Sequence, residues 1–249
     1  MKKARADELL AASKEVANQV EAQGLIMSGR VLWTDLRGSE RKVESAGQAL
    51  PIEARFRIKG RRPRFVSRGG EKLEAALAGF GVEVHGTKAI DLGISTGGFT
   101  DCLLQHGARE VWGVDVGYGL VADALRRDPR VRLLERTHVA TLTPKSIEGP
   151  ADLVVGDLSF ISLQRVLPVL VPLVVSGGPL ILLVKPQFEV EARHLEAGIV
   201  TEPEVRLAAL DKIRHSAEEL GFQVLNAMES PVHGAKGNIE WLMFARRAE

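Results

Sequence analysis

The fold is decided by one stretch of sequence, Lys88-Ala89-Ile90-Asp91-Leu92-Gly93-Ile94-Ser95-Thr96-Gly97-Gly98. Its first five residues predict a short buried strand, and the glycine-rich segment behind them predicts a sharp turn. Glycine has no Cβ, so Gly93, Gly97 and Gly98 let the backbone turn tightly and come close to a ligand. A strand that runs through such a turn into a helix is typical of the ligand-binding turn of an open α/β sheet.

Strand and helix patterns alternate beyond this stretch, which predicts a mostly parallel sheet covered by helices on both faces. Strands are expected at residues 88–92, 110–116, 131–134, 151–155, 180–184, 223–228 and 239–245. Helices are expected at residues 100–106, 120–126, 163–174 and 202–220. The last two strands are joined by residues 229–238, which are too few for a crossover helix, so this pair should be antiparallel. The sequence therefore predicts an α/β fold with a doubly wound seven-stranded sheet.

The N-terminal part of the chain has a different pattern. Short alternating segments at Arg30–Leu32 and Ala54–Ile58 are typical of strands, and the apolar residues before them have helical spacing. We predict a small α+β domain at residues 1–59, a basic linker at 60–70 and the larger domain at 71–249.

Composition narrows the class of protein. The chain has 249 residues and one cysteine, Cys102, which excludes an internal disulfide framework and favours a reducing compartment. Its basic start also carries Asp7 and Glu8 and lacks an apolar block, unlike a signal peptide. No apolar run is long enough to span a bilayer. We expect a cytoplasmic enzyme without membrane contact.

Positive charge is concentrated before the sheet. Residues 1–72 contain 16 Lys and Arg against 9 Asp and Glu, whereas the remainder contains 17 against 23. Such a basic segment attracts polyanions, although a solvated basic linker gives the same pattern. The candidate RNA-binding residues are Arg57, Lys59, Arg61, Arg62, Arg64 and Arg68.

The glycine-rich turn favours S-adenosylmethionine (SAM) over a dinucleotide. Asp91 stands where a dinucleotide motif begins, and its charge would repel a pyrophosphate but attract a sulfonium or an ammonium group. Asp115 ends the next predicted strand, where a carboxylate accepts hydrogen bonds from ribose hydroxyls. A plain turn or another nucleotide remains an alternative. The candidate cofactor-binding residues are Asp91, Gly93, Ser95, Thr96, Gly97, Gly98, Asp115, Val116 and Asp157.

Four further charged residues are candidates for a functional site. Asp157 and Lys185 each follow a predicted strand, at the edge of the sheet where ligands bind. Asp157 could instead cap the next helix, and Lys185 could lie in an exposed turn. A lysine removed from water favours its neutral amine and can act as a base. Lys72 precedes the first strand of the sheet and Glu240 interrupts the last one, where a carboxylate needs a partner or a purpose.

Several strings together resemble the hemolysin A (TlyA) family of ribosomal RNA methyltransferases, which is built on the FtsJ type of 2′-O-ribose methyltransferase. They are residues 66–73, 91–100, 115–119, 128–131, 152–162, 184–189 and 237–240. The resemblance implies a Rossmann-like SAM-dependent methyltransferase fold and a catalytic tetrad of Lys72, Asp157, Lys185 and Glu240. It implies SAM as cofactor, no metal, and ribosomal RNA or ribosomal subunits as partner, with a cytidine as the target.

The N-terminal domain resembles the small alpha-L RNA-binding module, with Asn18-Gln19 where that module usually has Ser-Arg. Thr137-His138-Val139-Ala140 departs from the family's Thr-Asn-x-Arg, and we interpret His138 as a surface or packing residue. Two other functions stay open. A non-catalytic SAM-binding ribosome-assembly factor would need Asp91 and Asp115 but not the tetrad, and the family's historical name suggests a membrane-lytic protein. The sequence leaves the oligomeric state open.

Overall fold

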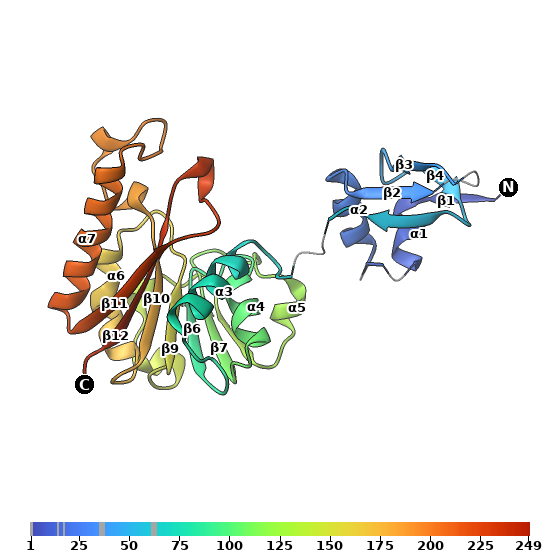
Figure 1. Ribbon diagram of the computed structural model, residues 1–249. Coiled ribbons are helices and arrows are strands. Elements are labelled where there is room, and N and C mark those ends of the chain that lie inside the picture. The colour runs from blue at the N-terminus through green and yellow to red at the C-terminus, as the bar shows by residue number, and fades with distance from the viewer. Residues whose placement is uncertain (1, 14, 17, 35–37, 61–63) are drawn as a thin grey trace. The chain divides into compact units, whose positions relative to one another are not determined.

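The computed structural model describes residues 2–13, 15–16, 18–34, 38–60 and 64–249. Contacts within the chain divide it into two compact units, Met1–Arg64 and Phe65–Glu249 (Figure 1). This boundary lies within residues 60–70. Each unit has its own apolar core.

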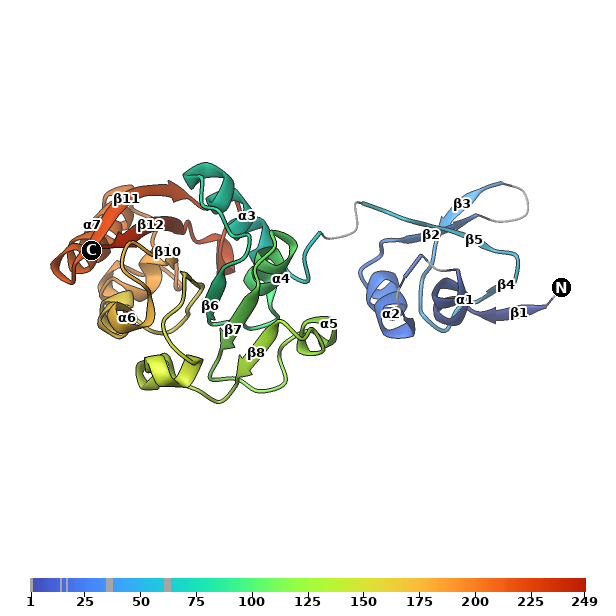
Figure 2. The same ribbon diagram turned by 90° about the horizontal axis from the view of Figure 1, so that it is seen from below.

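The larger unit is built on a single sheet of seven strands (Figure 2). Its strands are β6 (Lys88–Leu92), β7 (Glu110–Val114), β8 (Val131–Leu134), β9 (Leu153–Gly156), β10 (Pro179–Val184), β11 (Phe222–Glu229) and β12 (Trp241–Arg247). They lie in the order β11-β12-β10-β9-β6-β7-β8. β12 is antiparallel to both of its neighbours, and the other neighbouring pairs are parallel. The predicted α/β class and the antiparallel final pair are confirmed.

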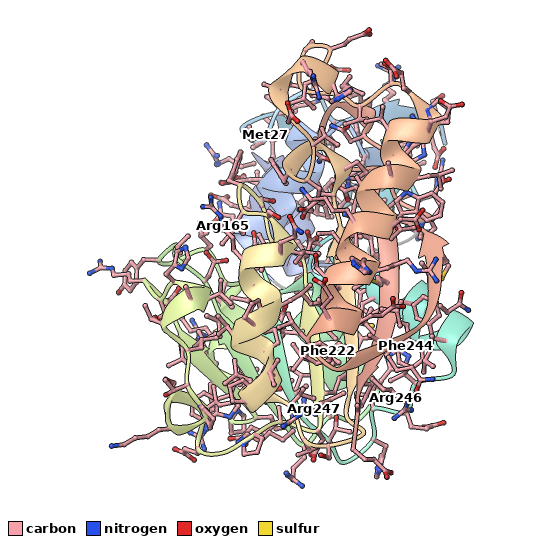
Figure 3. The ribbon with its side chains drawn as sticks, turned by 90° about the vertical axis from the view of Figure 1, so that its left-hand side faces the viewer. Met27, Arg165, Phe222, Phe244, Arg246 and Arg247 are labelled. Carbon is pink, nitrogen blue, oxygen red and sulfur yellow. The ribbon has the colours of Figure 1, made fainter. Side chains whose placement is uncertain are left out.

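Helices cover both faces of this sheet because its buried strands are apolar on both sides. Along β10, Leu180, Leu182 and Val184 pack toward α6 (Leu163–Leu170) and α7 (Pro203–Glu219). The alternate residues Ile181 and Leu183 pack toward the helices of the other face, α3 (Gly69–Phe80), α4 (Gly98–Gln105) and α5 (Asp123–Arg126). Figure 3 views α6 and α7 and labels Phe222 and Phe244, which belong to the two opposite clusters.

Two helices are shorter than the sequence predicts. The helix expected at residues 120–126 begins at Asp123, because Gly119 has a left-handed φ of 72° and Leu120 is 52 % exposed. The helix expected at 163–174 ends as an α-helix at Leu170 and continues as a 3₁₀ turn over Val171–Leu173. Proline at position 172 has no N–H for the α-helical ladder, which accounts for the change.

The N-terminal unit is a small α+β structure. Its elements are β1 (Lys3–Arg5), α1 (Ala6–Ala12), α2 (Gln19–Met27), β2 (Val31–Thr34), β3 (Glu40–Lys42), β4 (Ala49–Pro51) and β5 (Arg55–Ile58). They form the sheets β3-β2-β5 and β1-β4. The Asn18 side chain caps α2 by accepting the Glu21 N–H at 2.9 Å. The Gln19 amide donates to the buried carboxylate of Asp7 at 3.1 Å, so both residues that depart from the Ser-Arg pattern stabilise the unit.

Candidate active site

Two adjoining cavities open where β6, β7, β9 and β10 end. The first cavity has a volume of about 390 Å³ and is lined by Lys72, Lys185 and Glu240. The second cavity has a volume of about 430 Å³ and is lined by Asp115 and Val116. Ligands of doubly wound sheets bind at this edge, beyond the carboxyl ends of the strands. Both cavities are lined by the glycine-rich turn and by the loop after β9, and they share Gly93, Ser95, Asp157, Ser159 and Phe160.

The glycine-rich turn packs too closely for side chains at its key positions. Gly93 has a φ of 77°, and a Cβ there would come within 2.8 Å of the Asp157 carbonyl oxygen. A Cβ on Gly98 would come within 2.8 Å of the Gly70 nitrogen, at the start of α3. Glycine at these positions therefore brings β6, α3 and the loop after β9 together around the cavities.

Asp91 lies beneath this turn and is almost completely buried. Its Oδ2 accepts hydrogen bonds from the Thr100 N–H at 3.0 Å and the Thr100 hydroxyl at 2.7 Å. Its Oδ1 has no hydrogen-bond partner among the described residues. The pKa of Asp91 is raised to about 7, mainly by burial. The hydrogen bonds from Thr100 lower this pKa, whereas the nearby charges of Asp157 and Asp115 raise it. A positive charge nearby would therefore favour the ionised carboxylate of Asp91.

Asp115 follows β7 and lines the second cavity. Its carboxylate accepts the Ser95 N–H at 2.8 Å and the Gly117 N–H at 2.7 Å. These bonds fix the carboxylate beside the glycine-rich turn. The next residue, Val116, is 66 % exposed and lines the same cavity. An acidic group next to an exposed apolar side chain matches the polar sugar and the flat apolar base of a nucleoside.

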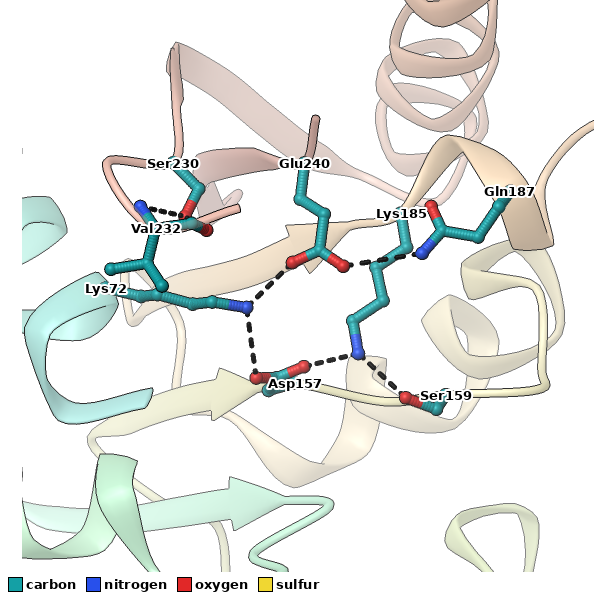
Figure 4. Close-up of polar contacts among 8 residues, drawn as sticks. All are labelled: Lys72, Asp157, Ser159, Lys185, Gln187, Ser230, Val232 and Glu240. Carbon is teal, nitrogen blue, oxygen red and sulfur yellow. Dashed lines mark hydrogen bonds and ion pairs between the residues drawn. The ribbon is translucent and has the colours of Figure 1, made fainter. Parts of the chain in front are cut away.

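The first cavity contains a chain of alternating charges (Figure 4). Lys185 Nζ, at the end of β10, lies 2.6 Å from Oδ1 of Asp157. Oδ2 of Asp157 lies 3.7 Å from Nζ of Lys72 on α3. Lys72 Nζ in turn donates to Oε2 of Glu240 at 2.7 Å, just before β12. Four segments far apart in sequence thus place two lysines and two acids in one network.

Three members of this network are buried. Lys72 is 7 % exposed, Lys185 8 % and Glu240 2 %. Each charge has an oppositely charged neighbour, which offsets the cost of removing it from water. Gly234 packs directly against the Glu240 carboxylate, where a Cβ would overlap it. Asp157 does not cap a helix, since the N-cap of α6 is Ser162, and Lys185 does not lie in an exposed turn.

Comparison with known proteins identifies the larger unit. A family model described as FtsJ-like methyltransferase matches residues 65–247. The chain belongs to the FtsJ-like methyltransferase family.

Relatives of this FtsJ-like methyltransferase support the assignment. The 16S/23S rRNA (cytidine-2′-O)-methyltransferase TlyA of Mycobacterium tuberculosis is 46 % identical over 183 residues, which cover 73 % of this chain and 68 % of the relative. A solved Streptococcus thermophilus protein, provisionally named a hemolysin, is 37 % identical with a TM-score of 0.76 and covers 100 % of this chain and 90 % of its own. A SAM-dependent methyltransferase from Mesorhizobium loti shares the fold, with 18 % identity, a TM-score of 0.53 and coverage of 73 % and 100 %.

The methyltransferase also contains polar contacts that its sequence did not single out. Ser159 accepts a hydrogen bond from Lys185 Nζ at 2.8 Å. The buried carboxylate of Glu189 accepts the Ser162 hydroxyl at 2.6 Å and the Leu163 N–H at 2.8 Å, at the start of α6. Burial raises the pKa of Glu189. The sequence signals were weak, because serines and glutamates of this kind are common in loops and gain their partners only in the fold.

The candidate RNA-binding residues of the methyltransferase have different surroundings. Arg57 forms a two-pronged ion pair with Glu40, with both N–O distances 2.6 Å. Lys59 follows β5, and its carbonyl oxygen accepts from Arg30 at 3.1 Å. Arg68 is the N-cap of α3 and lines the first cavity, whereas Arg64 ends the N-terminal unit. Arg61 and Arg62 lie outside the described residues.

The structure also bears on the predictions about His138, a metal ion and a membrane span. His138 is exposed, lines the second cavity and accepts the Ala140 N–H at 3.1 Å through Nδ1. In the described part of the chain, His, Cys, Asp and Glu side chains form no group of three suited to a metal ion. None of the helices in the described ranges combines the length and apolar character needed to cross a bilayer.

Proposed function

We propose that this FtsJ-like methyltransferase transfers a methyl group from SAM to the 2′-hydroxyl of a cytidine in ribosomal RNA. The observation that carries the proposal is the buried Lys72–Glu240, Asp157 and Lys185 network beside a nucleoside-sized cavity with Asp115 at its wall. The relative from M. tuberculosis, named for this reaction, supports the choice of rRNA and cytidine.

The residues around the glycine-rich turn fit SAM. Asp115 and the exposed Val116 would hold the ribose and the adenine. The turn residues that line the first cavity, Gly93, Ser95, Thr96 and Gly98, would hold the methionine part. The buried Asp91, with one unpaired oxygen, favours a ligand that carries positive charge. When bound, SAM supplies an electrophilic methyl group, and its sulfur keeps the electron pair of the broken carbon–sulfur bond.

The tetrad residues would orient and deprotonate the attacking hydroxyl. A ribose hydroxyl is a weak acid, so the methyl transfer needs a base that receives its proton and a rigid alignment of the reacting atoms. Lys185 is the base, since its amine lies in the first cavity and is almost fully buried. Asp157 holds the amine, while Lys72 and Glu240 fix Asp157 and contact the substrate ribose.

RNA is favoured over DNA because only RNA has the 2′-hydroxyl. Lys59, Arg64, Arg68 and the basic residues 61–62 would contact phosphates without regard to sequence, and this binding should weaken as salt rises.

The test is methyl transfer from labelled SAM by the purified full chain. Naked rRNA, each assembled ribosomal subunit and a DNA copy serve as acceptors, and ribose methylation is mapped on the product. We expect label in rRNA at a cytidine and none in DNA. Lys185→Ala should abolish transfer while SAM binding persists. Full transfer by Lys185→Ala would overturn the assignment, and SAM binding without any transfer by the wild type would favour a non-catalytic assembly factor.

A further inference from the structure

Lys185 has a polar neighbour outside the four charged residues, the hydroxyl of Ser159. Lys185 Nζ donates to Ser159 Oγ at 2.8 Å, in addition to its 2.6 Å contact with Asp157 (Figure 4). Ser159 lies two residues after Asp157 and lines both cavities. We infer that Ser159 is a positioning residue that aims the Lys185 amine at the substrate hydroxyl and stabilises the ammonium formed when Lys185 takes the proton.

The geometry of an amine explains this role. A neutral lysine amine has two N–H groups and one lone pair, and an ammonium has three N–H groups. Ser159 accepts one N–H group of the amine, and the Asp157 carboxylate lies 2.6 Å from the nitrogen as an ion-pair contact. In the neutral form, these two acceptors repel the lone pair and favour its turning away from them, toward the substrate. After the lone pair takes the 2′-hydroxyl proton, Ser159 accepts a hydrogen bond from the ammonium and the Asp157 carboxylate offsets its charge, so both interactions become stronger.

The Ser159 hydroxyl has no local structural use among the described residues. Its Oγ contacts Lys185 and makes no hydrogen bond to the surrounding backbone. Ser162, three residues later, behaves differently. Its Oγ accepts the Gln164 N–H at 3.2 Å and so caps α6, and it donates to Glu189 at 2.6 Å. The Ser162 hydroxyl therefore stabilises the start of α6, whereas the hydrogen bond of the Ser159 hydroxyl is to the Lys185 amine.

The loop that carries Ser159 is tied to the loop that carries Lys185. The ring of Phe160, whose φ of 64° is left-handed, lies 5.2 Å from the ring of Phe188. Ser162 and Glu189 join the same two loops by a hydrogen bond. With the Ser159–Lys185 bond there are three ties, so the two loops cannot easily shift the serine away from the amine.

Other groups around the Lys185 amine set the charge that it experiences. Asp157 faces it directly, and Lys72 on α3 reaches the other oxygen of Asp157 at 3.7 Å. Glu240 offsets Lys72 at 2.7 Å, and the Phe188 ring centre lies 6.0 Å from the amine. Ser159 is the neutral acceptor in this set, so its removal changes the hydrogen bonding of the amine without changing the net charge.

The test compares Ser159→Ala, Ser159→Thr and, as a control, Ser162→Ala in the full chain. The rate measurements in this test rest on the proposed function, because they require methyl transfer to rRNA. Ser159→Ala loses an acceptor that stabilises the ammonium, so the acid limb of the pH–rate profile should shift to lower pH. The plateau kcat should fall on the order of tenfold, while the KM for RNA changes little. Ser159→Thr should restore both values. Ser162→Ala should lower the melting temperature and leave the midpoint of the acid limb in place.

A measurement without turnover separates this inference from the proposed function. The Lys185 side-chain amine can be titrated by NMR in the protein without RNA or SAM, and Ser159→Ala should move its titration midpoint to lower pH. An unchanged midpoint, with or without turnover, would overturn the role of Ser159. A wild-type chain that transfers no methyl group to rRNA would overturn the proposed function and leave the NMR test of Ser159 valid.

Discussion

Lys72 Nζ donates to Oε2 of Glu240 at 2.7 Å, although 168 positions of sequence separate the two residues. Their side chains are 9 % and 2 % exposed. Removing one member of such a pair leaves the other charge buried without its main partner, whereas replacing both members by apolar groups removes the problem. Variants of this pair can therefore show its contribution to stability apart from its contribution to catalysis.

Glu240→Ala should lower the free energy of unfolding by about 3 kcal/mol, because Lys72 would keep only its longer contact with Asp157. The double variant Lys72→Met with Glu240→Leu should recover most of this loss, yet both proteins should fail to methylate rRNA. Urea unfolding and methyl transfer measure the two effects. A double variant that is less stable than Glu240→Ala would contradict the prediction.

Asp91 should make SAM binding depend on pH. Its pKa is about 7 in the folded chain, so below that pH the carboxyl is largely neutral. A bound cation favours the carboxylate, so binding should release a proton, and SAM affinity should rise as pH rises toward 7. Calorimetry in buffers of different ionisation enthalpy measures the released proton. Asp91→Asn should bind SAM more weakly and without this pH dependence. If the variant still released a proton on binding SAM, Asp91 would not be the group that loses it.

The same carboxyl affects stability without SAM. The pKa of Asp91 is raised from an ordinary value of 3.8 to about 7, so between these values the folded chain binds more protons than the unfolded chain. Its contribution to stability should therefore decrease as pH rises through this window. Thermal unfolding of the wild type and Asp91→Asn at several pH values tests this. The melting temperature of the wild type should fall relative to that of the variant as pH rises.

Gly93→Ala should damage the SAM site beyond the cost of its backbone. Position 93 has a φ of 77°, and the added Cβ would meet the Asp157 carbonyl at 2.8 Å. Gly81→Ala is the matched control, since Gly81 has a φ of 63° with open space around it. The control should lose about 1 kcal/mol of stability and keep SAM affinity. Gly93→Ala should lose more stability and bind SAM weakly in direct titration. Equal losses of stability and SAM affinity in the two variants would show that the contact with the Asp157 carbonyl does not matter.

Glu40 should limit RNA binding by the N-terminal unit. It neutralises Arg57 through an exposed two-pronged ion pair with distances of 2.6 Å. Glu40→Gln should raise RNA affinity and steepen its salt dependence by about one phosphate contact, because Arg57 becomes available. Stability should change little, since exposed pairs contribute little. Filter binding at several salt concentrations checks this. Unchanged affinity in Glu40→Gln would indicate that Arg57 lies away from the RNA.

Much of the fold could be predicted from local sequence. β6, β9 and β10 are buried on both faces, so their apolar residues mark their positions in the sequence. The short link before β12 required an antiparallel strand. Helix ends were less certain. The start of α5 depends on the left-handed turn at Gly119, and the end of α6 depends on proline at position 172.

Single residues in strong local contexts also predicted half of the candidate site. Asp91 and Asp115 end neighbouring strands, so the sequence alone places them at one edge of the sheet beside the glycine-rich turn. Lys72 and Glu240 had no local explanation in the sequence beyond a family resemblance. The structure gives them one, because the sheet order brings β12 next to β10 and α3 packs against β12.

The sequence by itself determined which backbone segments form the sheet and where a ligand-binding turn must occur, because strand propensity and glycine act over a few residues. Only the tertiary structure decided which side chains meet. The contacts of Lys185 with Ser159, of Glu189 with the start of α6 and of Arg57 with Glu40 each join distant segments. A hydrogen bond or an ion pair acts over about 3 Å, so no local pattern records it until the chain has folded.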